Sequence, residues 1–281
     1  MNFKTMIAVT SMASMVLAGC HSADTHEGAS QINRTTEFSD SSHQFTPEIM
    51  WKMGRIGSYH LTADGKNSVY GVTYYSVEQN KSRSVIYAST PSSKSTATLL
   101  TETSDSEFSP SFIPGTNKVA YLAADKEGVT QLWMMDADGS GRKQISFETS
   151  DVNDYLFSPC GKKVILVKTV NHESSVQEND ADLKLSTGIV ANDLMYKHWD
   201  EWVDEIPHPY LADFDGNTVT NPRDILKGEL YESPMRPFGG MEQFAWSPDG
   251  KTVAYTCRKK TGAAYSKSTD SDIYLYNIET G

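Results

Sequence analysis

A strand–turn–strand pattern occurs four times along the chain, and it restricts the possible fold more than any other feature. The copies are HLTADGKNSVYGV (60–72), SFIPGTNKVAYLA (111–123), LFSPCGKKVILVK (156–168) and AWSPDGKTVAYTC (245–257). Each has an apolar strand end, a turn rich in Pro, Gly and Asp, a lysine, and then alternating β-branched and aromatic residues. The pattern predicts two antiparallel strands joined by a tight turn.

Each copy is followed by a second shared pattern, which predicts a third strand ending in a polar turn. These segments are SVIYASTPSS (84–93), TQLWMMDADGSG (130–141), HPYLADFDGN (208–217) and SDIYLYNIETG (271–281), and short fourth strands are predicted at 97–101, 142–146 and 223–227. Four short antiparallel strands per repeat is typical of a β-propeller blade. A β-sandwich, the alternative, would not reproduce both turn types in a fixed order.

We therefore expect an all-β fold, an incomplete β-propeller with four recognisable four-stranded blades in a domain spanning 46–281. The sequence stops at Gly281 inside the closing turn of the fourth blade, so we expect this blade to be truncated and the sequence to be a fragment. The spacing also predicts an insertion, because Phe157 and Trp246 are 89 residues apart whereas Phe112 and Phe157 are 45 apart. This acidic insertion covers about 171–205, between the second and third strands of the third blade.

The N-terminus has the pattern of a processing signal. Lys4 precedes an apolar run at 6–17, which is too short to span a bilayer, and Leu17-Ala18-Gly19-Cys20 follows. This tetrapeptide resembles the lipobox of bacterial lipoproteins, and an ordinary cleaved signal is the alternative. We expect a lipoprotein signal peptide at 1–19 and a lipidated Cys20 that begins a flexible tether at 20–45. The protein would then be an exported, periplasmic or cell-envelope lipoprotein, and His21 in place of Asp favours an outer-membrane anchor.

Local composition and charge add three further expectations. Thr46-Pro47-Glu48 predicts an N-cap and a short helix across 49–56. Cys160 and Cys257 are predicted to be unpaired. A net charge of −11 repels phosphate backbones, so nucleic acid is excluded as an expected partner.

The hairpins and two longer regions of the chain, 193–210 and 257–277, resemble a known family. The hairpins are similar to the repeats of TolB and of the prolyl oligopeptidase family, and DLMYKHWDEWV (193–203), HPY (208–210), CRKKTGAAYS (257–266) and SDIYLYN (271–277) resemble its bacterial dipeptidyl-peptidase V branch. The resemblance implies an exported serine exopeptidase that releases dipeptides from free N-termini. In such enzymes an N-terminal propeller gates access to a C-terminal α/β-hydrolase domain, and propeller carboxylates can hold the substrate amine.

The sequence departs from this pattern because it has no catalytic residues of the family. No G-x-S-x-G nucleophile elbow occurs, and Gly139-Ser140-Gly141 has the spacing of a β-turn. The hydrolase domain that carries the triad would have to lie outside this chain, and no cofactor is expected. The alternative function is a non-catalytic, TolB-like envelope propeller that binds a protein or peptide partner.

The peptide YKHWDEWVDEIPHP (196–209), at the end of the insertion, is the candidate site, and four interpretations are open. A metal site and paired-carboxylate catalysis are weakly supported, because neither metal-ligand spacing nor a cleft is indicated. Tyr196, Trp199 and Trp202 could instead only pack on the blade as a short helix or turn. The fourth hypothesis is that Glu201, Asp204 or Glu205 binds the free N-terminus of a peptide substrate, while Trp199 and Trp202 shape the pocket.

Overall fold

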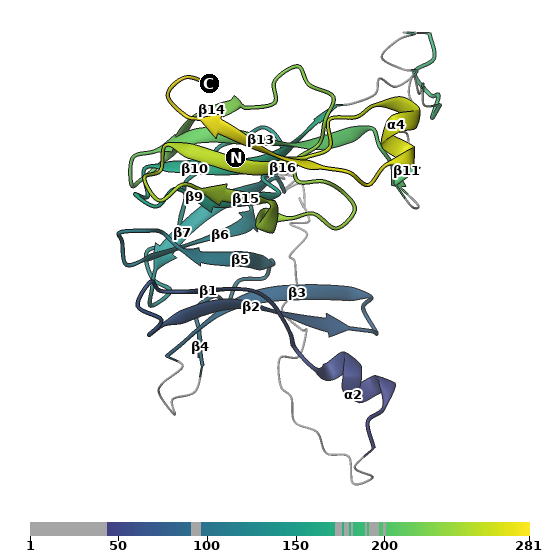
Figure 1. The fold of residues 1–281 in the computed structure, drawn as a ribbon. Coiled ribbons are helices and arrows are strands. Elements are labelled where there is room, and N and C mark those ends of the chain that lie inside the picture. The colour runs from purple at the N-terminus through teal and green to yellow at the C-terminus, as the bar shows by residue number, and fades with distance from the viewer. Residues whose placement is uncertain are drawn as a thin grey trace, which may run out of the picture.

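The chain folds almost entirely into antiparallel sheets. The structure is a computed structural model that describes residues 44–90, 97–171, 176, 180, 182–188, 190, 197–198 and 201–281. In these residues there are three four-stranded sheets, one three-stranded sheet and a two-stranded ladder. Figure 1 shows the first, second and third sheets following one another from bottom to top of the molecule, with the fourth sheet overlapping the third in this view.

The first two sheets each comprise four strands in sequence order. The first contains β1 (Arg55–Leu61), β2 (Ser68–Ser76), β3 (Lys81–Ser89) and β4 (Thr98–Leu99). The second contains β5 (Glu107–Phe112), β6 (Lys118–Ala124), β7 (Thr130–Asp136) and β8 (Lys143–Gln144).

The third and fourth sheets differ in size. The third contains β9 (Asp154–Phe157), β10 (Lys163–Asn171), β13 (Glu205–Phe214) and β14 (Val219–Asp224). The fourth contains β15 (Phe244–Trp246), β16 (Thr252–Cys257) and β17 (Asp272–Asn277). The remaining elements are α2 (Pro47–Lys52), η1 (Met241–Gln243), α4 (Gly262–Lys267) and the ladder of β11 (Lys197–His198) with β12 (Glu201–Trp202).

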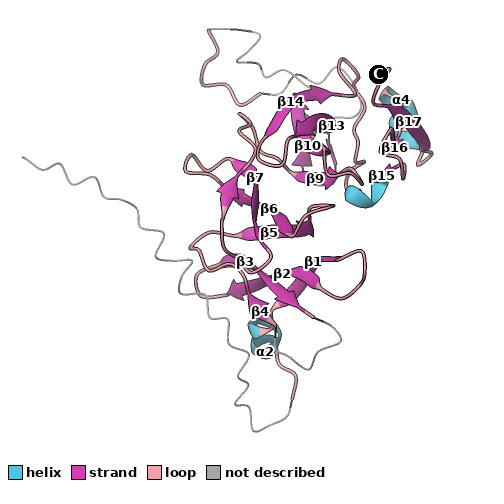
Figure 2. Cartoon of the chain, turned by 90° about the vertical axis from the view of Figure 1, so that its left-hand side faces the viewer, coloured by secondary structure: helices cyan, strands magenta, loops and turns pink. Residues whose placement is uncertain are grey.

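The predicted fold is confirmed: each sequence repeat forms one sheet, and the sheets do not close into a ring. Cys160 and Cys257 are both free, as predicted. Figure 2 shows the same succession of sheets from the side, with α2 beside the first sheet and α4 beside the fourth. The arrangement is that of an open propeller.

Two predicted elements have the wrong bounds. The helix ends at Lys52 and not near residue 56, because Arg55 already pairs with Thr73 in the first sheet. Its start is as predicted, since the Thr46 hydroxyl accepts a hydrogen bond from the Ile49 amide at 3.3 Å.

The fourth strand of the third blade is β14, and the prediction of 223–227 is wrong for most of its length. The Asp224 carboxylate accepts a hydrogen bond from the Leu226 amide at 2.8 Å, which holds 225–228 in a turn. The apolar Leu226, which suggested a strand, is instead buried in this turn against the fourth sheet.

Turn chemistry explains why the hairpin pattern is repeated. In the fourth sheet the Ser247 hydroxyl donates to the Asp249 carboxylate at 2.6 Å and accepts from the Thr252 amide at 2.9 Å. Gly250 follows with φ +69°, a conformation that a residue with a side chain rarely adopts. Equivalent glycines with positive φ are Gly65, Gly115 and Gly161.

The core lies between the sheets, because the side chains of each strand alternate between two neighbours. In β10, Val164 and Leu166 pack with the second sheet, whereas Ile165 and Val167 pack with the fourth. All four are at most 2% exposed. A strand covered on both faces reads as a continuous apolar run, here Val-Ile-Leu-Val.

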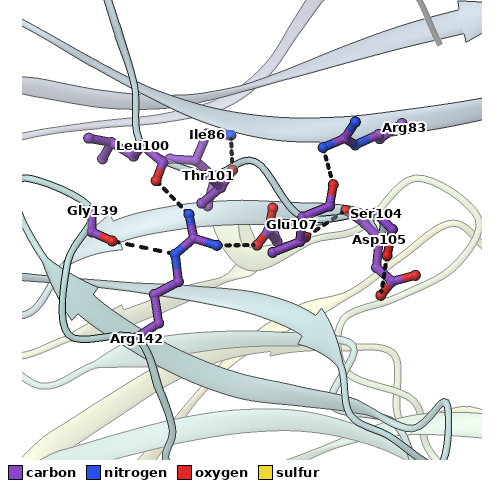
Figure 3. A network of polar contacts seen from close by, with 10 residues as sticks. Arg83, Ile86, Leu100, Thr101, Ser104, Asp105, Glu107, Gly139 and Arg142 are labelled. Atoms are coloured by element: carbon purple, nitrogen blue, oxygen red, sulfur yellow. Dashed lines mark hydrogen bonds and ion pairs between the residues drawn. The ribbon is translucent and has the colours of Figure 1, made fainter. Parts of the chain in front are cut away.

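A buried polar network joins the first and second sheets (Figure 3). The Arg142 guanidinium contacts the Glu107 carboxylate at 3.3 Å and donates to the Leu100 carbonyl at 2.6 Å. Glu107 is 3% exposed, and burial raises the pKa of its carboxyl group. Because Leu100 directly follows β4, Arg142 fixes the end of the first sheet against the second.

Candidate functional site

One side of the propeller carries α2, α4 and the β11–β12 ladder (Figure 1). On this side the second strand of each sheet connects to the third, and the connection from β10 to β13 runs through 172–204. β10 and β13 pair continuously from Lys163 with Asp213 to Asn171 with Glu205. The acidic segment therefore leaves and rejoins the third sheet at one point, where Glu205 begins β13.

The base of this segment is anchored by apolar packing. Val203 and Ile206 are 2% and 0% exposed and form a cluster with Tyr265 of α4. Asp204 and Glu205 lie between them in sequence and are both exposed. The alternation of buried and exposed positions thus directs the two acids away from the apolar cluster.

The structure places the other predicted residues less completely. Trp202 lies in β12 and is 48% exposed, and the ladder pairs Lys197 with Trp202 and His198 with Glu201. The described part of this peptide is therefore a two-stranded ladder and not a helix, and packing of the peptide on the blade as a turn stays a prediction. Trp199 and the side chain of Glu201 lie outside the described residues, so their roles stay predictions.

A pocket of about 660 Å³ opens where the second, third and fourth sheets meet, and we name it the rim pocket. Its walls are the β6–β7 turn, the segment entering β9, the ends of β10 and β13, and the segment between β14 and η1. Of the predicted acids with a described side chain, Glu205 lines it and Asp204 does not. Its charged lining residues are Glu127, Asp151, Asp154, Glu205 and Arg236.

Two of the lining acids already have partners. The Asp151 carboxylate accepts a hydrogen bond from the Thr130 amide at 2.6 Å. Glu127 lies 3.2 Å from the ammonium group of Lys126 in an exposed ion pair. Within the described residues, Glu205 makes no ion pair, and Asp154 makes none and accepts a hydrogen bond only from the amide of its neighbour Tyr155. These two carboxylates are therefore the ones available to a cationic ligand.

Asp154 is the functional candidate that sequence reasoning missed. It begins β9 and pairs with Val167 of β10. Desolvation raises the pKa of its carboxyl group to about 6, and Glu242 adds to the rise although the Tyr155 amide donates to it at 2.9 Å. The available signal was an acid just before the first predicted strand of the third blade, at Asn153-Asp154-Tyr155.

The HPY stretch that supported the family resemblance is mainly structural. His208 is 1% exposed, and its Nδ1 lies 2.9 Å from the Asp224 carboxylate. In the opposite strand, the Lys168 ammonium group lies 2.6 Å from the Glu148 carboxylate and 4.6 Å from the centre of the Tyr210 ring. These contacts fix the third sheet beneath the rim pocket.

In the described part of the chain, no group of three or more His, Cys, Asp or Glu residues is placed to hold a metal ion. No helix in that part is long and apolar enough to cross a membrane. Ser140 lies in a turn between β7 and β8, as predicted, and its hydroxyl donates to Asp138 at 2.6 Å.

Sequence comparisons identify close relatives. The chain is 39% identical over 242 residues to Dipeptidyl-peptidase 5 of Porphyromonas gingivalis, covering 86% of the chain and 35% of the relative. It is 36% identical over 277 residues to Dipeptidyl-peptidase 5 of Porphyromonas endodontalis, covering 99% of the chain and 38% of the relative. No family model matches the chain.

A structural comparison agrees in fold. The acylaminoacyl peptidase of Pyrococcus horikoshii superposes with a TM-score of 0.57 over 80% of the chain and 31% of that protein, at 14% identity. The chain spans little more than a third of the curated relatives it matches. The chain is therefore an open propeller. Over most of its own length it is homologous to a part of these two dipeptidyl-peptidases that makes up little more than a third of their length.

Proposed function

We propose that this chain is the substrate-gating propeller of a longer, exported serine exopeptidase that releases dipeptides from free N-termini. The observation that carries the proposal is the identity of 36–39% to two dipeptidyl-peptidases over 86–99% of the chain. In the longer protein, an α/β-hydrolase domain would supply the serine nucleophile, its histidine base and the oxyanion donors. The propeller would hold the substrate peptide in position for cleavage.

The proposed role of the rim pocket is to hold the substrate's terminal ammonium group. Glu205 supports this role because it lines the pocket and makes no ion pair with any described residue. It is also the first residue of β13, where the acidic insertion rejoins the third sheet. A hydrogen bond between an ammonium group and a carboxylate contributes about 1.5–3 kcal/mol. Holding the amine at a fixed distance from the scissile bond would limit each cleavage to two residues.

Access to the pocket is proposed to be restricted by the first strands of the sheets. Asp154 lines both the rim pocket and a second cavity of about 250 Å³. This second cavity is bordered by residues of β1, β5 and β9, the first strand of each of three sheets. A substrate peptide that passes from the second cavity into the rim pocket would pass the Asp154 carboxylate.

The proposed location follows from the N-terminal pattern. Lipidation of Cys20 would tether the propeller to a membrane of the cell envelope through acyl chains. A Cys20→Ser variant would then move to the supernatant when membranes are sedimented. Retention of this variant in the membrane fraction would contradict the lipid anchor.

Calorimetric titration of the purified chain with two peptides tests the amine site. Ala-Phe-amide has a free amine, whereas N-acetyl-Ala-Phe-amide does not. We expect the free amine to bind at least about tenfold more tightly, and Glu205→Gln to remove most of this preference. Asp204→Asn is the matched control, because it removes the same charge one residue away from the lining of the pocket.

Two results would count against this assignment. Equal affinity for the two peptides would contradict recognition of the N-terminus by the rim pocket. A preference for the free amine that survives Glu205→Gln and disappears in Asp154→Asn would place the ammonium group at Asp154 and not at Glu205.

A further inference from the structure

The described lining of the rim pocket includes a cation as well as acids. Among the residues that the structure describes, Arg236 is the only Lys, Arg or His in this lining. Among the described residues, its guanidinium group makes no ion pair with any of the lining acids. A guanidinium group presents a planar fork of donors that matches a carboxylate, so an unpaired arginine in a pocket is suited to an anionic group of a ligand.

The segment that carries Arg236 is held in place at both ends. At its start, the Ser233 amide donates to the Pro207 carbonyl of β13 at 2.9 Å. Further along, the Gln243 side chain accepts from the Met235 amide at 2.9 Å. Arg236 is therefore presented by an ordered connection between the third and fourth sheets.

Gly239 makes this connection possible. Its amide donates to the Met235 carbonyl at 2.8 Å, which closes a turn around Arg236. A Cβ atom at Gly239 would lie 2.2 Å from the Met235 carbonyl oxygen and 2.3 Å from the Gln243 side chain. The backbone thus passes too close for any side chain at this position.

The two available acids lie toward opposite ends of the pocket. Asp154 pairs with Val167 and Glu205 pairs with Asn171, which places the acids about 13 Å apart along β10. The segment with Arg236 is bonded at Ser233 to Pro207, near the Glu205 end, and leads to Glu242, which raises the pKa of Asp154. A ligand bound at either acid would thus lie beside this segment.

We propose that the rim pocket binds short peptides as zwitterions, with the ammonium group at a pocket carboxylate and the peptide's own carboxylate on Arg236. The proposal rests on the proposed amine site and extends it. A pocket of about 660 Å³ falls in the range that encloses small ligands. The ligand class with both charges at short separation is the free dipeptide, which is the product of the proposed reaction.

Calorimetric titration of the purified chain with Ala-Phe and Ala-Phe-amide tests the role of Arg236. We expect Ala-Phe to bind about tenfold more tightly than the amide, and Arg236→Gln to reduce this difference to less than about twofold. Arg236→Lys should retain part of it, because it keeps the charge and loses the planar fork. Arg55→Gln in the first sheet is the control for loss of one positive charge and should leave the difference unchanged.

Asp-Phe-amide distinguishes the two possible sources of the carboxylate. Weak binding, like that of Ala-Phe-amide, supports the C-terminal carboxylate of a free dipeptide. Binding as tight as that of Ala-Phe would refute this assignment and place an acidic side chain of the first residue on Arg236.

The proposal is overturned if Ala-Phe and its amide bind equally, or if their difference persists in Arg236→Gln. Failure of the amine site gives a separate result. In that case N-acetyl-Ala-Phe would bind as tightly as Ala-Phe, whether or not binding depends on Arg236.

Discussion

Strands β10 and β17 have similar apolar patterns but very different surroundings. In β10, Val164, Ile165, Leu166 and Val167 are at most 2% exposed. In β17, Tyr274 and Tyr276 pack toward the third sheet, whereas Ile273 and Leu275 are 74% and 73% exposed. The two strands differ because β10 has a sheet on each side and β17 has a sheet on one side.

The comparison shows that burial in a propeller is supplied by neighbouring sheets and not by the strand itself. Two apolar residues on the outer face of an edge strand form a surface suited to pairing or packing with another sheet. On the proposed function, further blades of the longer protein would cover Ile273 and Leu275. Paired substitutions in the inner and outer regions can test this comparison.

The largest expected difference concerns the apolar core. Leu166→Ala removes a fully buried side chain between the second and third sheets and should reduce the free energy of unfolding by about 3–5 kcal/mol. The same change at Leu275 should cost less than about 0.5 kcal/mol, because this side chain is exposed. Urea unfolding of the two variants measures both values, and equal losses would contradict the comparison.

A smaller difference is expected between two ion pairs. The Lys168–Glu148 pair has side chains that are each 11% exposed, so Glu148→Gln leaves a nearly buried ammonium group and should cost about 2–3 kcal/mol. In the fourth sheet, Lys251 and Glu279 are 59% and 66% exposed, and Glu279→Gln should cost less than about 1 kcal/mol. Thermal unfolding at low and high salt would compare them. A larger loss in Glu279→Gln would reverse the expected order.

The smallest difference concerns the pH dependence of two aspartates. The folded-state pKa of Asp154 is raised by desolvation to about 6, above the unfolded value, so the folded protein binds more protons between about pH 4 and pH 6. Stability therefore falls as the pH rises through this window. Asp154→Asn should stabilise the fold by about 1–2 kcal/mol at pH 7.5 and by about zero at pH 3.5.

Asp249 provides the contrast in sign. A hydrogen bond from Ser247 lowers the pKa of this exposed turn aspartate, so its contribution is present at neutral pH and lost as the pH falls. Asp249→Asn should therefore destabilise the protein at pH 7.5. Unfolding curves measured from pH 3.5 to 7.5 would decide, and a stabilising effect of Asp249→Asn would contradict the account.

Much of the fold follows from local chemistry that is legible in the sequence. The Ser-Pro-Asp-Gly-Lys turn specifies its own hydrogen bonds, and Thr46 specifies the start of α2. Element ends were harder to predict, because they depend on pairing with distant residues. Arg55 was predicted in the helix but pairs with Thr73 in the first sheet. Leu226 was predicted in a strand but lies in a turn, buried against the fourth sheet.

The candidate site was only partly predictable for the same reason. Glu205 could be found because it lies in an unusual peptide at the end of an insertion. Asp154 and Arg236 are 82 residues apart in sequence and line one pocket only after the third and fourth sheets stack. His208 belongs to the same unusual peptide, yet it is buried against Asp224 and serves packing.

The intact mass of the native protein, extracted with detergent from its source membranes, tests the central claim most directly. If the chain is the propeller of a longer dipeptidyl-peptidase, its 31.1 kDa would be about 38% of the whole, and a mass of roughly 80 kDa is expected. Further blades and a hydrolase domain would account for the difference. A mass near that of the propeller alone would contradict the claim and favour a non-catalytic binding protein of the cell envelope.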